Sequence, residues 1–382
     1  MEGEKILHVV SVSFAINHFF GDQFVYLQNK NHKEYHLACS PSAEFLALAE
    51  KLHYKPLPIE ITRAISPWRD VKAIYKIYKY IKKNKITKVV GHTPKGGMVA
   101  MIASFLTQTP VRIYFRHGII YETSHSFKRV LLKNIERLSG YLATQVVCVS
   151  KSVLEISVND RLNAITKNSM LGLGTCNGID TEGKYNPANI SSEATQALKK
   201  QYGITENDTI VGYVGRLVRD KGIDDLLKSW DIIEKQYPKA KLLLVGPIED
   251  RDSISEESKN KIQEKSSIIF TDFVPNASAF FTLMDVFVLP TYREGFPTVA
   301  LEAASMKLPV IITKATGCTE AIVENETGLF ITNEPTDIAH KIIYYLQNNS
   351  QAVLNGIEGR KFVKKNFEQT KIWDLISSEL KL

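Results

Sequence analysis

Short apolar runs alternate with amphipathic segments of helical period along almost the whole chain. Apolar runs of this length are typical of buried parallel strands, and the segments between them of crossover helices. In the first half, the pattern predicts strands at 6–12, 35–39, 86–91, 111–115 and 145–149. Between them it predicts helices at 70–83, 97–106, 127–138 and 150–158.

The alternation stops at residues 180–192, a stretch with the turn signal Asn186-Pro187, Gly183 and two serines, and then restarts. The second half predicts strands at 210–214, 241–245, 267–270, 286–289 and 310–313. Helices are expected at 223–236, 255–265, 298–306, 336–348, 351–366 and 370–380. The fold expected is α/β, with two doubly wound Rossmann-like domains at 1–180 and 181–366 and a C-terminal helix at 367–382 that packs back on the first. Ligands of such sheets bind beyond the carboxyl ends of the strands, so we expect the site in the crevice between the domains.

Composition narrows the class of protein. The chain has 382 residues, 44% of them hydrophobic and 23% charged, which is enough apolar material for two cores. No uncharged apolar run approaches the roughly 20 residues that a membrane span needs. The four cysteines show no close pairing, which argues against a disulfide framework or a zinc site. Since residues 1–5 do not resemble a secretory leader, we expect a cytoplasmic protein, and peripheral attachment to the inner face of the cell membrane is compatible with this.

The net charge of +7 is distributed unevenly. Residues 1–190 carry 25 Lys and Arg against 14 Asp and Glu, whereas the remainder carries 23 against 27. The asymmetry indicates an anionic partner for the first half, which is a nucleic acid, a phospholipid surface or a phosphorylated substrate.

Two loops of the second half carry candidate chemistry. The strand 210–214 runs into Gly215, where the backbone can turn tightly, and then into Arg216 and Lys221, two cations suited to a diphosphate. The alternative is a solvated basic loop.

The second of these loops precedes the helix 298–306. Pro297 suits its first turn, and its leading backbone N–H groups at Thr298 and Val299 favour an anion. Glu294 and Glu302 are acceptors for hydroxyl groups, as on a sugar. Either one alone is more simply a helix-start acid or a solvated side chain.

Two strand ends of the first half also carry candidate functional residues. His92 and Lys95 follow the strand 86–91, and Arg116 and His117 follow 111–115. A single histidine at such a place is more often structural than functional. Two adjacent strand ends that both present a histidine and a cation favour a functional role over a structural one.

The motifs together resemble glycosyltransferase family 4, whose members are retaining enzymes of GT-B architecture. The resemblance rests on Gly-Arg-Leu-x-x-x-Lys-Gly at 215–222 and on Glu-Gly-Phe-Pro at 294–297 with a second glutamate eight positions after Glu294. The segments 92–97, 116–118 and 177–180 are similar to bacterial members that build capsular, exopolysaccharide or lipid-linked glycans. The likeness extends from about residue 5 to about residue 367. The loop 13–21 departs from it, because many members have a glycine pair there, and Lys307 stands where this subfamily commonly has glycine.

The resemblance implies roles for individual residues. Arg216 and Lys221 would bind the donor diphosphate, Glu294 would contact hydroxyl groups of the donor sugar, and Glu302 would hold the ribose. The nucleotide base would meet the backbone around Phe273 and Val274, and His117 would lie beside the transferred sugar. The catalytic set it implies is His117, Arg216, Lys221 and Glu294. The donor-binding set is Gly215, Arg216, Lys221, Phe273, Val274, Glu294, Gly295, Phe296, Pro297, Thr298 and Glu302. The acceptor-side candidates are His92, Lys95, Arg116 and His117.

The reaction implied is transfer of a hexosyl or N-acetylhexosaminyl group from a nucleotide-sugar, a UDP-sugar, to a saccharide or polyprenyl-diphosphate-linked saccharide. We expect no metal and no cofactor. The Asp-x-Asp sequence Asp250-Arg251-Asp252 lies in an acidic turn typical of exposed surface. The lysine-rich segment 70–85 suits an anionic membrane, although a crossover helix explains its apolar stripe. No nucleic acid partner is expected.

The sequence also bears on three other functions. An oxidoreductase would need Gly-x-Gly-x-x-Gly after the first strand, where residues 11–20 contain no glycine. A sugar-nucleotide epimerase of the same architecture is the alternative that fits the motifs best. A nucleic-acid-binding or scaffold protein would explain the basic half but would leave Glu294 and Glu302 without a role.

Overall fold

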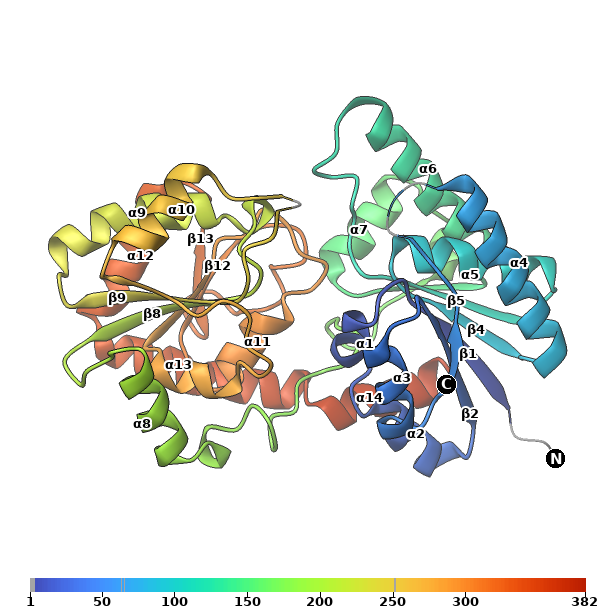
Figure 1. Cartoon of the computed structure of the whole chain (residues 1–382), viewed down its shortest axis with the longest axis horizontal. Helices are drawn as coiled ribbons and strands as arrows, with labels where there is room; N and C mark the ends of the chain where they lie inside the picture. The colour runs from blue at the N-terminus through green and yellow to red at the C-terminus, as the bar shows by residue number, and fades with distance from the viewer. Residues whose placement is uncertain (1–3, 63, 65, 251) are drawn as a thin grey trace. The chain divides into compact units, whose positions relative to one another are not determined.

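The computed structural model describes residues 4–62, 64, 66–250 and 252–382. These form two compact units. Unit 1 comprises the chain up to Gly178 together with Thr370–Leu382, and unit 2 comprises Ile179–Gln369. Each unit is built on one parallel sheet (Figure 1).

Unit 1 has a seven-stranded sheet in the order β3-β2-β1-β4-β5-β6-β7. Its strands are β1 (Lys5–Val9), β2 (Glu34–Cys39), β3 (Lys55–Pro58), β4 (Lys88–Gly91), β5 (Val111–Arg116), β6 (Gln145–Cys148) and β7 (Asn168–Ser169). Its helices are α1 (Phe14–Phe19), α2 (Gln23–Asn31), α3 (Ala43–Lys51), α4 (Pro67–Asn84), α5 (Pro94–Leu106), α6 (Ser126–Leu142), α7 (Lys151–Asn159) and α14 (Gln369–Glu379). The chain moves outward from β1 to β3 and then crosses to β4. Right-handed crossovers therefore place α2 and α3 on one face and α4, α5 and α6 on the other, as Figure 1 shows.

Unit 2 has a six-stranded sheet in the order β10-β9-β8-β11-β12-β13. Its strands are β8 (Thr209–Val214), β9 (Ala240–Val245), β10 (Ile268–Phe270), β11 (Val286–Leu289), β12 (Val310–Thr313) and β13 (Gly328–Ile331). Its helices are α8 (Ser192–Gln201), α9 (Ile223–Gln236), α10 (Glu256–Glu264), α11 (Thr298–Ser305), α12 (Pro335–Gln347) and α13 (Asn349–Asn366). The strand order reverses between β8 and β11. A sheet of this kind opens a ligand crevice at such a reversal.

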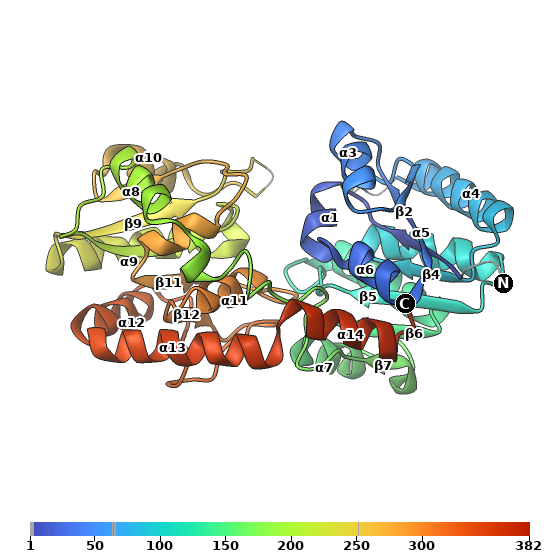
Figure 2. The ribbon, with the colours of Figure 1, turned by 90° about the horizontal axis from the view of Figure 1, so that it is seen from below.

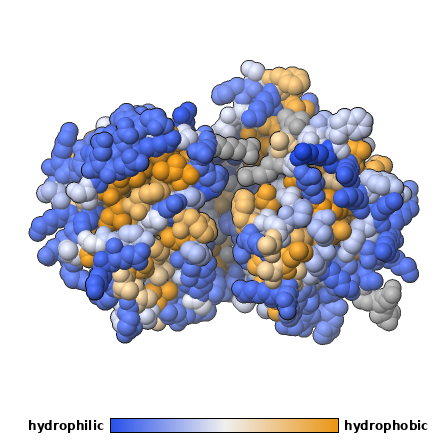
Figure 3. Space-filling model, viewed as in Figure 1, coloured by the Kyte–Doolittle hydropathy of each residue, from blue (hydrophilic) through white to orange (hydrophobic). Residues whose placement is uncertain are grey.

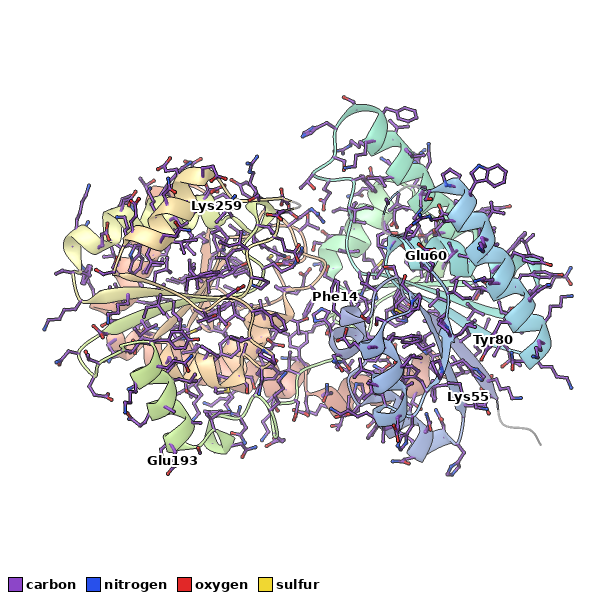
Figure 4. The ribbon with its side chains drawn as sticks, viewed as in Figure 1. Phe14, Lys55, Glu60, Tyr80, Glu193 and Lys259 are labelled. Carbon is purple, nitrogen blue, oxygen red and sulfur yellow. The ribbon has the colours of Figure 1, made fainter. Side chains whose placement is uncertain are left out.

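The ten predicted strands and the ten predicted helices all occur, with bounds that shift by a few residues. The elements that were not predicted are mostly short. Strand β3 has the sequence Lys-Pro-Leu-Pro and lies at the edge of its sheet, where the missing N–H groups of proline are tolerated. The loop predicted at 13–21 contains α1, whose first residue Phe14 projects from the ribbon in Figure 4.

The last helix, α14, is anchored in unit 1 by polar contacts. The Tyr26 hydroxyl of α2 donates a hydrogen bond of 2.6 Å to Asp374, and Trp373 Nε1 donates one of 2.8 Å to Asn177 Oδ1. It is the red helix that carries the C-terminus in Figure 2. No helix in the described part of the chain combines the length and the apolar character that crossing a membrane requires.

Candidate functional site

The loop that follows β8 starts with a glycine in a conformation that other residues adopt only with strain. Gly215 has a φ of +148°, and a Cβ atom there would lie 2.9 Å from the hydroxyl oxygen of Tyr213. The same hydroxyl donates to the carbonyl oxygen of Arg216 at 2.9 Å. The Gly215 N–H donates to the carbonyl of Val245 in β9 at 2.9 Å. These contacts fix the start of the loop at the reversal point of the sheet.

One aspartate joins this loop to the loop that follows β11. The Asp220 N–H donates to the Asp252 carboxylate at 2.9 Å, and its carbonyl oxygen accepts from the Tyr292 N–H at 3.0 Å. The Asp220 carboxylate forms an ion pair of 2.9 Å with Arg293. The two predicted motif loops are therefore held together by backbone and side-chain contacts.

This connection brings Lys221 and Glu294 into contact. The Lys221 ammonium donates to the Glu294 carboxylate, and only 17% and 15% of the two side chains are exposed. Glu294 is fixed from the other side, because its N–H donates to the Thr316 carbonyl at 2.8 Å. Gly317 has a φ of +82°, and a Cβ atom there would lie 2.4 Å from the Glu294 carbonyl oxygen. Because water is largely excluded, a charge placed here acts more strongly than one on the surface.

Arg216 is placed differently from Lys221. Its guanidinium forms a 2.7 Å ion pair with Glu249 in the loop after β9, and 46% and 36% of the two side chains are exposed. Exposed pairs of this kind contribute only about 0–1 kcal/mol. A diphosphate could therefore compete for Arg216 at little cost, and its role as a phosphate ligand stays a prediction.

The start of α11 offers fewer free N–H groups than the sequence predicts. The Thr298 N–H donates to the Phe296 carbonyl at 3.0 Å, and the Ala300 N–H donates to the Pro297 carbonyl at 2.9 Å. Val299 also belongs to the first turn, whose N–H groups have no intrahelical acceptor. The anion site predicted here therefore depends on Val299 more than on Thr298.

Glu302 lies one turn inside α11, between the buried residues Leu301 and Ala303. Burial raises the pKa of the Glu302 carboxyl, and the nearby Tyr185 hydroxyl and Lys184 oppose this effect. The Glu302 carboxyl is thus engaged by the hydroxyl of Tyr185, and its contact with a ribose stays a prediction.

The predicted base contacts lie after β10. Phe273 is largely exposed and its N–H donates to its neighbour Asp272 at 2.8 Å, whereas Val274 packs against the core of unit 2. Their contact with a nucleotide base stays a prediction.

In unit 1 the structure places His92 and His117 together and adds a third histidine. His8 Nδ1 lies 3.1 Å from His92 Nε2, and His92 Nδ1 lies 3.0 Å from His117 Nε2. Phe19 of α1 stacks on His117 with ring centroids 3.9 Å apart. Burial lowers the pKa of His8 and of His117 to about 3, with a further contribution from His18 for His117, and it lowers that of His92 strongly. All three rings are therefore neutral near pH 7.

Two further acceptor-side candidates are engaged within unit 1. Lys95 forms a 2.6 Å ion pair with Asp70 of α4, and both side chains are mostly buried. His92 is buried behind His117 in the row just described. Of the two, only Lys95 retains some exposed surface on which an acceptor could bind.

The prediction that Arg116 faces the acceptor is wrong. Its side chain is 0% exposed and forms a 3.0 Å ion pair with Glu136 of α6, which is 1% exposed. Arg116 Nη1 also donates to Asn163 Oδ1 at 3.0 Å and to the Ser157 hydroxyl. The Tyr114 hydroxyl donates to the same Glu136 at 2.9 Å. Residues 114 and 116 share one face of β5 because side chains alternate along a strand, and that face is covered by α6.

No group of three or more His, Cys, Asp or Glu side chains is arranged to hold a metal ion within the described ranges. The predicted Asp-x-Asp segment is only partly described, since Arg251 lies outside the described residues. Its Asp252 carboxylate accepts the Asp220 N–H and so helps to shape the loop that carries Lys221. The expectation that the reaction needs no metal stays a prediction.

Sequence reasoning missed several residues that build the site. His8 lies inside a strand, and Asp220 and Asp252 act through backbone contacts, so none of them follows a motif. Only Gly317 carried a usable signal, a glycine after the strand 310–313. A glycine after a parallel strand commonly marks a close backbone approach.

Comparison with known proteins supports the family resemblance inferred from the motifs. Residues 194–362 match the family described as glycosyl transferases group 1, and residues 25–164 match glycosyltransferase family 4. Over 379 residues the chain is 32% identical to the capsular polysaccharide biosynthesis glycosyltransferase CapM of Staphylococcus aureus, covering 99% of this chain and 97% of that protein.

A second relative and a solved structure extend the comparison. The chain is 27% identical to the UDP-Gal:alpha-D-GlcNAc-diphosphoundecaprenol alpha-1,3-galactosyltransferase of Escherichia coli, with 77% of this chain and 74% of that protein covered. The crystal structure of Anabaena Alr3699/HepE in complex with UDP-glucose superposes with a TM-score of 0.81 at 18% identity, covering 99% of each chain. That likeness bears on the fold, and with the two parallel sheets it confirms the predicted GT-B class.

Proposed function

Because the chain belongs to glycosyltransferase family 4, we propose that it transfers a sugar from a UDP-sugar to a polyprenyl-diphosphate-linked saccharide with retention of configuration. The observation that carries this proposal is the contact between Lys221 and Glu294, which joins the two loops at the strand reversal of unit 2. The names of two similar proteins agree with this proposal. One is a galactosyltransferase named for UDP-Gal and a diphosphoundecaprenol acceptor, and the other was crystallised with UDP-glucose.

Lys221 and Glu294 suit two parts of one donor. A diphosphate gains negative charge as it leaves, and a fixed ammonium in a water-poor site stabilises that charge. The Glu294 carboxylate accepts hydrogen bonds from sugar hydroxyl groups. In the proposed step the bond from the anomeric carbon to the phosphate oxygen breaks and a bond to the acceptor oxygen forms on the same face. The departing phosphate takes the acceptor proton, so no protein base and no metal is required.

A donor screen tests this proposal. We expect UDP and UDP-hexoses to raise the melting temperature of unit 2, because ligand bound at 100 times its Kd adds about 2.7 kcal/mol to stability. The shift should be measured by scanning calorimetry with UDP-, GDP- and ADP-sugars at equal concentration. The donor that binds should then be incubated with a lipid-linked saccharide, and the anomeric configuration of the product determined by NMR.

The control for the screen is the same donor without an acceptor. Isomerised donor under those conditions would establish the epimerase instead. Stabilisation by GDP-sugars alone would contradict the UDP donor, and an inverted product would contradict retention.

A surface of unit 1 supports a membrane-bound acceptor. Helices α4, α5 and α6 lie side by side on one face of the sheet. Trp68 of α4 is 85% exposed and Phe127 of α6 is 78% exposed. Together with other apolar side chains at helical spacing they form what we call the α4–α6 face: Trp68, Val71, Tyr75, Phe127, Val130, Leu138 and Tyr141. Figure 3 shows hydrophobic residues gathered at the tip of unit 1 where α6 lies.

Basic residues surround this face. Lys72, Lys76, Lys79, Lys128 and Arg129 are all exposed on the same two helices. The apolar stripe predicted on α4 does pack inward through Ile77 and Ile81, as a crossover helix requires. The exposed aromatic side chains are additional to it. Amphipathic surfaces with lysines beside aromatic rings bind anionic lipid, and each basic residue contributes about 1 kcal/mol near such a surface.

We expect the protein to sediment with vesicles that contain anionic phospholipid and to be released as salt increases. Replacing Trp68 and Phe127 together by serine should reduce the bound fraction at least tenfold, since each buried ring contributes about 1.5–3 kcal/mol. Cosedimentation at several salt concentrations measures both effects.

The matched control replaces Val353 and Leu354, which are also exposed apolar residues but lie on α13 of unit 2. Vesicle binding should be unchanged in that variant. Equal binding to neutral vesicles, or equal loss in both variants, would contradict the α4–α6 face as the membrane contact.

A further inference from the structure

The three histidines of unit 1 cross three adjacent strands. His8 belongs to β1, His92 follows β4 and His117 follows β5, and these strands are neighbours in the sheet. The rings also lie nearly parallel where they meet, with 17° between His8 and His92 and 33° between His92 and His117. Strand order reverses between β1 and β4, so this row stands at the position of unit 1 that corresponds to the Lys221 loop of unit 2.

Hydrogen bonding restricts the protons of this row to two arrangements. A neutral imidazole has one N–H donor and one acceptor nitrogen. His92 contacts a histidine through each of its nitrogens, at 3.1 and 3.0 Å, so it must donate to one neighbour and accept from the other. The protons therefore all point from His8 toward His117 or all point the opposite way.

The inner end of the row decides between the two arrangements. His8 is 2% exposed, and its Nε2 atom has no hydrogen-bond partner in the described part of the chain. Phe20, Phe24 and Tyr35 pack around the ring. A buried N–H without an acceptor is rarer in proteins than a buried acceptor without a donor. The proton of His8 therefore belongs on Nδ1, where it donates to His92.

The same end shows that the row does not conduct protons. A proton wire needs an exchanging group at each end, and the His8 end is enclosed by aromatic side chains. What the row can do is fix the state of its outer member. With protons pointing outward, His92 Nδ1–H donates to His117 Nε2, and the proton of His117 must sit on Nδ1.

We propose that His8 and His92 are positioning residues that hold His117 as the neutral tautomer with its proton on Nδ1. His117 is the partly exposed member of the row, and Phe19 holds its ring plane by stacking at 3.9 Å and 18°. His117 then offers a fixed N–H donor at a site that hydroxyl and phosphate oxygens can accept from. This inference rests on the proposed function where it assigns the His117 N–H group a role in sugar transfer.

The tautomer is tested without any activity assay. In protein labelled with nitrogen-15, long-range proton–nitrogen NMR distinguishes a protonated Nδ1 from a protonated Nε2. We expect His117 of the wild-type protein to be protonated at Nδ1 across pH 6–8. In His8→Phe the row loses its inner donor, and His117 should become a mixture of both tautomers. In His8→Asn the side-chain amide can replace the Nδ1–H group, and the wild-type pattern should return.

Kinetics test the role in transfer. His8→Phe should lower kcat by about tenfold while the KM for the donor changes less than twofold, and His8→Asn should recover most of the loss. The matched control is His36→Phe, which removes another buried histidine on the neighbouring strand β2, one that contacts Tyr80 at 2.7 Å rather than the row. It should leave both the His117 tautomer and kcat unchanged.

The outcomes separate the two proposals. A wild-type His117 protonated at Nε2, or a tautomer that is the same in His8→Phe, would overturn the inference whatever the activity. An unchanged kcat in His8→Phe with an altered tautomer would overturn the positioning role. The predicted NMR pattern in a protein that transfers no sugar would support the tautomer assignment and would overturn the proposed function instead.

Discussion

Replacing Lys221 by alanine is expected to lower kcat for sugar transfer by about 10²–10³-fold. The ammonium lies in a largely buried contact with Glu294, at the strand reversal where a donor diphosphate is proposed to bind. Removing one charge-stabilising group from such a site commonly costs a factor of this size. Glu294→Ala should cause a similar loss through the sugar hydroxyl groups. Steady-state kinetics of sugar transfer, with the sugar donor identified by calorimetry, measure kcat of both variants.

The chain provides a closely matched control for this experiment. Lys241 forms a 2.9 Å ion pair with Asp208, and 22% and 12% of these side chains are exposed, much as for Lys221 and Glu294. Lys241 lies near the start of β9, at the opposite end of the strands from the motif loops. Lys241→Ala should retain kcat within a factor of three. Equal losses in both lysine variants would mean that Lys221 only stabilises the fold, and wild-type turnover in both Lys221→Ala and Glu294→Ala would refute the site.

A double variant that combines Lys221→Ala with Glu294→Ala tests whether the two residues act in one step or independently. Lys221 and Glu294 contact one another and are proposed to act on one step, and residues of that kind are not additive. The double variant should therefore lose little more than the worse single variant. A loss equal to the product of the two single effects would indicate that they act on separate steps.

The donor loops illustrate what the sequence does specify. Gly215, Lys221 and Glu294 were predicted from their place after two strands, and the structure brings Lys221 and Glu294 into contact. Such a prediction works because the carboxyl ends of parallel strands meet at one edge of a sheet, so position along the chain translates directly into position in space. The family resemblance that these motifs suggested is confirmed by the family match of residues 194–362 and by the 32% identity to the capsular glycosyltransferase CapM over 379 residues.

Sequence patterns were less informative where a partner comes from another strand or loop of the sheet. The contact of Arg216 with Glu249, from the loop after β9, is a pairing that no spacing indicates, and the role of Arg216 as a phosphate ligand stays a prediction. His8 was overlooked because it lies within an apolar run, and its importance depends on β1 being the neighbour of β4. Strand order is a property of the whole sheet, and the local pattern does not contain it.

Arg116 shows how the position of a residue at a strand end can mislead, and its replacement is expected to destabilise unit 1 strongly. It adjoins His117, but alternation along β5 turns the two side chains to opposite faces. His117 joins the row of histidines, and Arg116 enters the protein interior to contact Glu136. We expect Arg116→Met to lower the free energy of unfolding of unit 1 by about 3–5 kcal/mol, because it leaves a carboxylate buried without its cation. Urea titration with hydrogen-exchange detection of the β5 and β6 amides measures the change in this unit alone.

Arg69 is the control that isolates burial from charge. It forms an ion pair with Glu60 at 2.9 Å, nearly the same distance as the 3.0 Å of Arg116 with Glu136, and it belongs to the same unit. Both Arg69 and Glu60 are 60% exposed, so Arg69→Met should change stability by less than about 1 kcal/mol. If Arg116→Met were instead as stable as wild type, the buried contact of Arg116 with Glu136 would contribute nothing to the stability of unit 1. The two ion pairs have closely similar distances. The difference between the losses of stability in Arg116→Met and in Arg69→Met therefore measures how strongly unit 1 depends on the buried contact between β5 and α6.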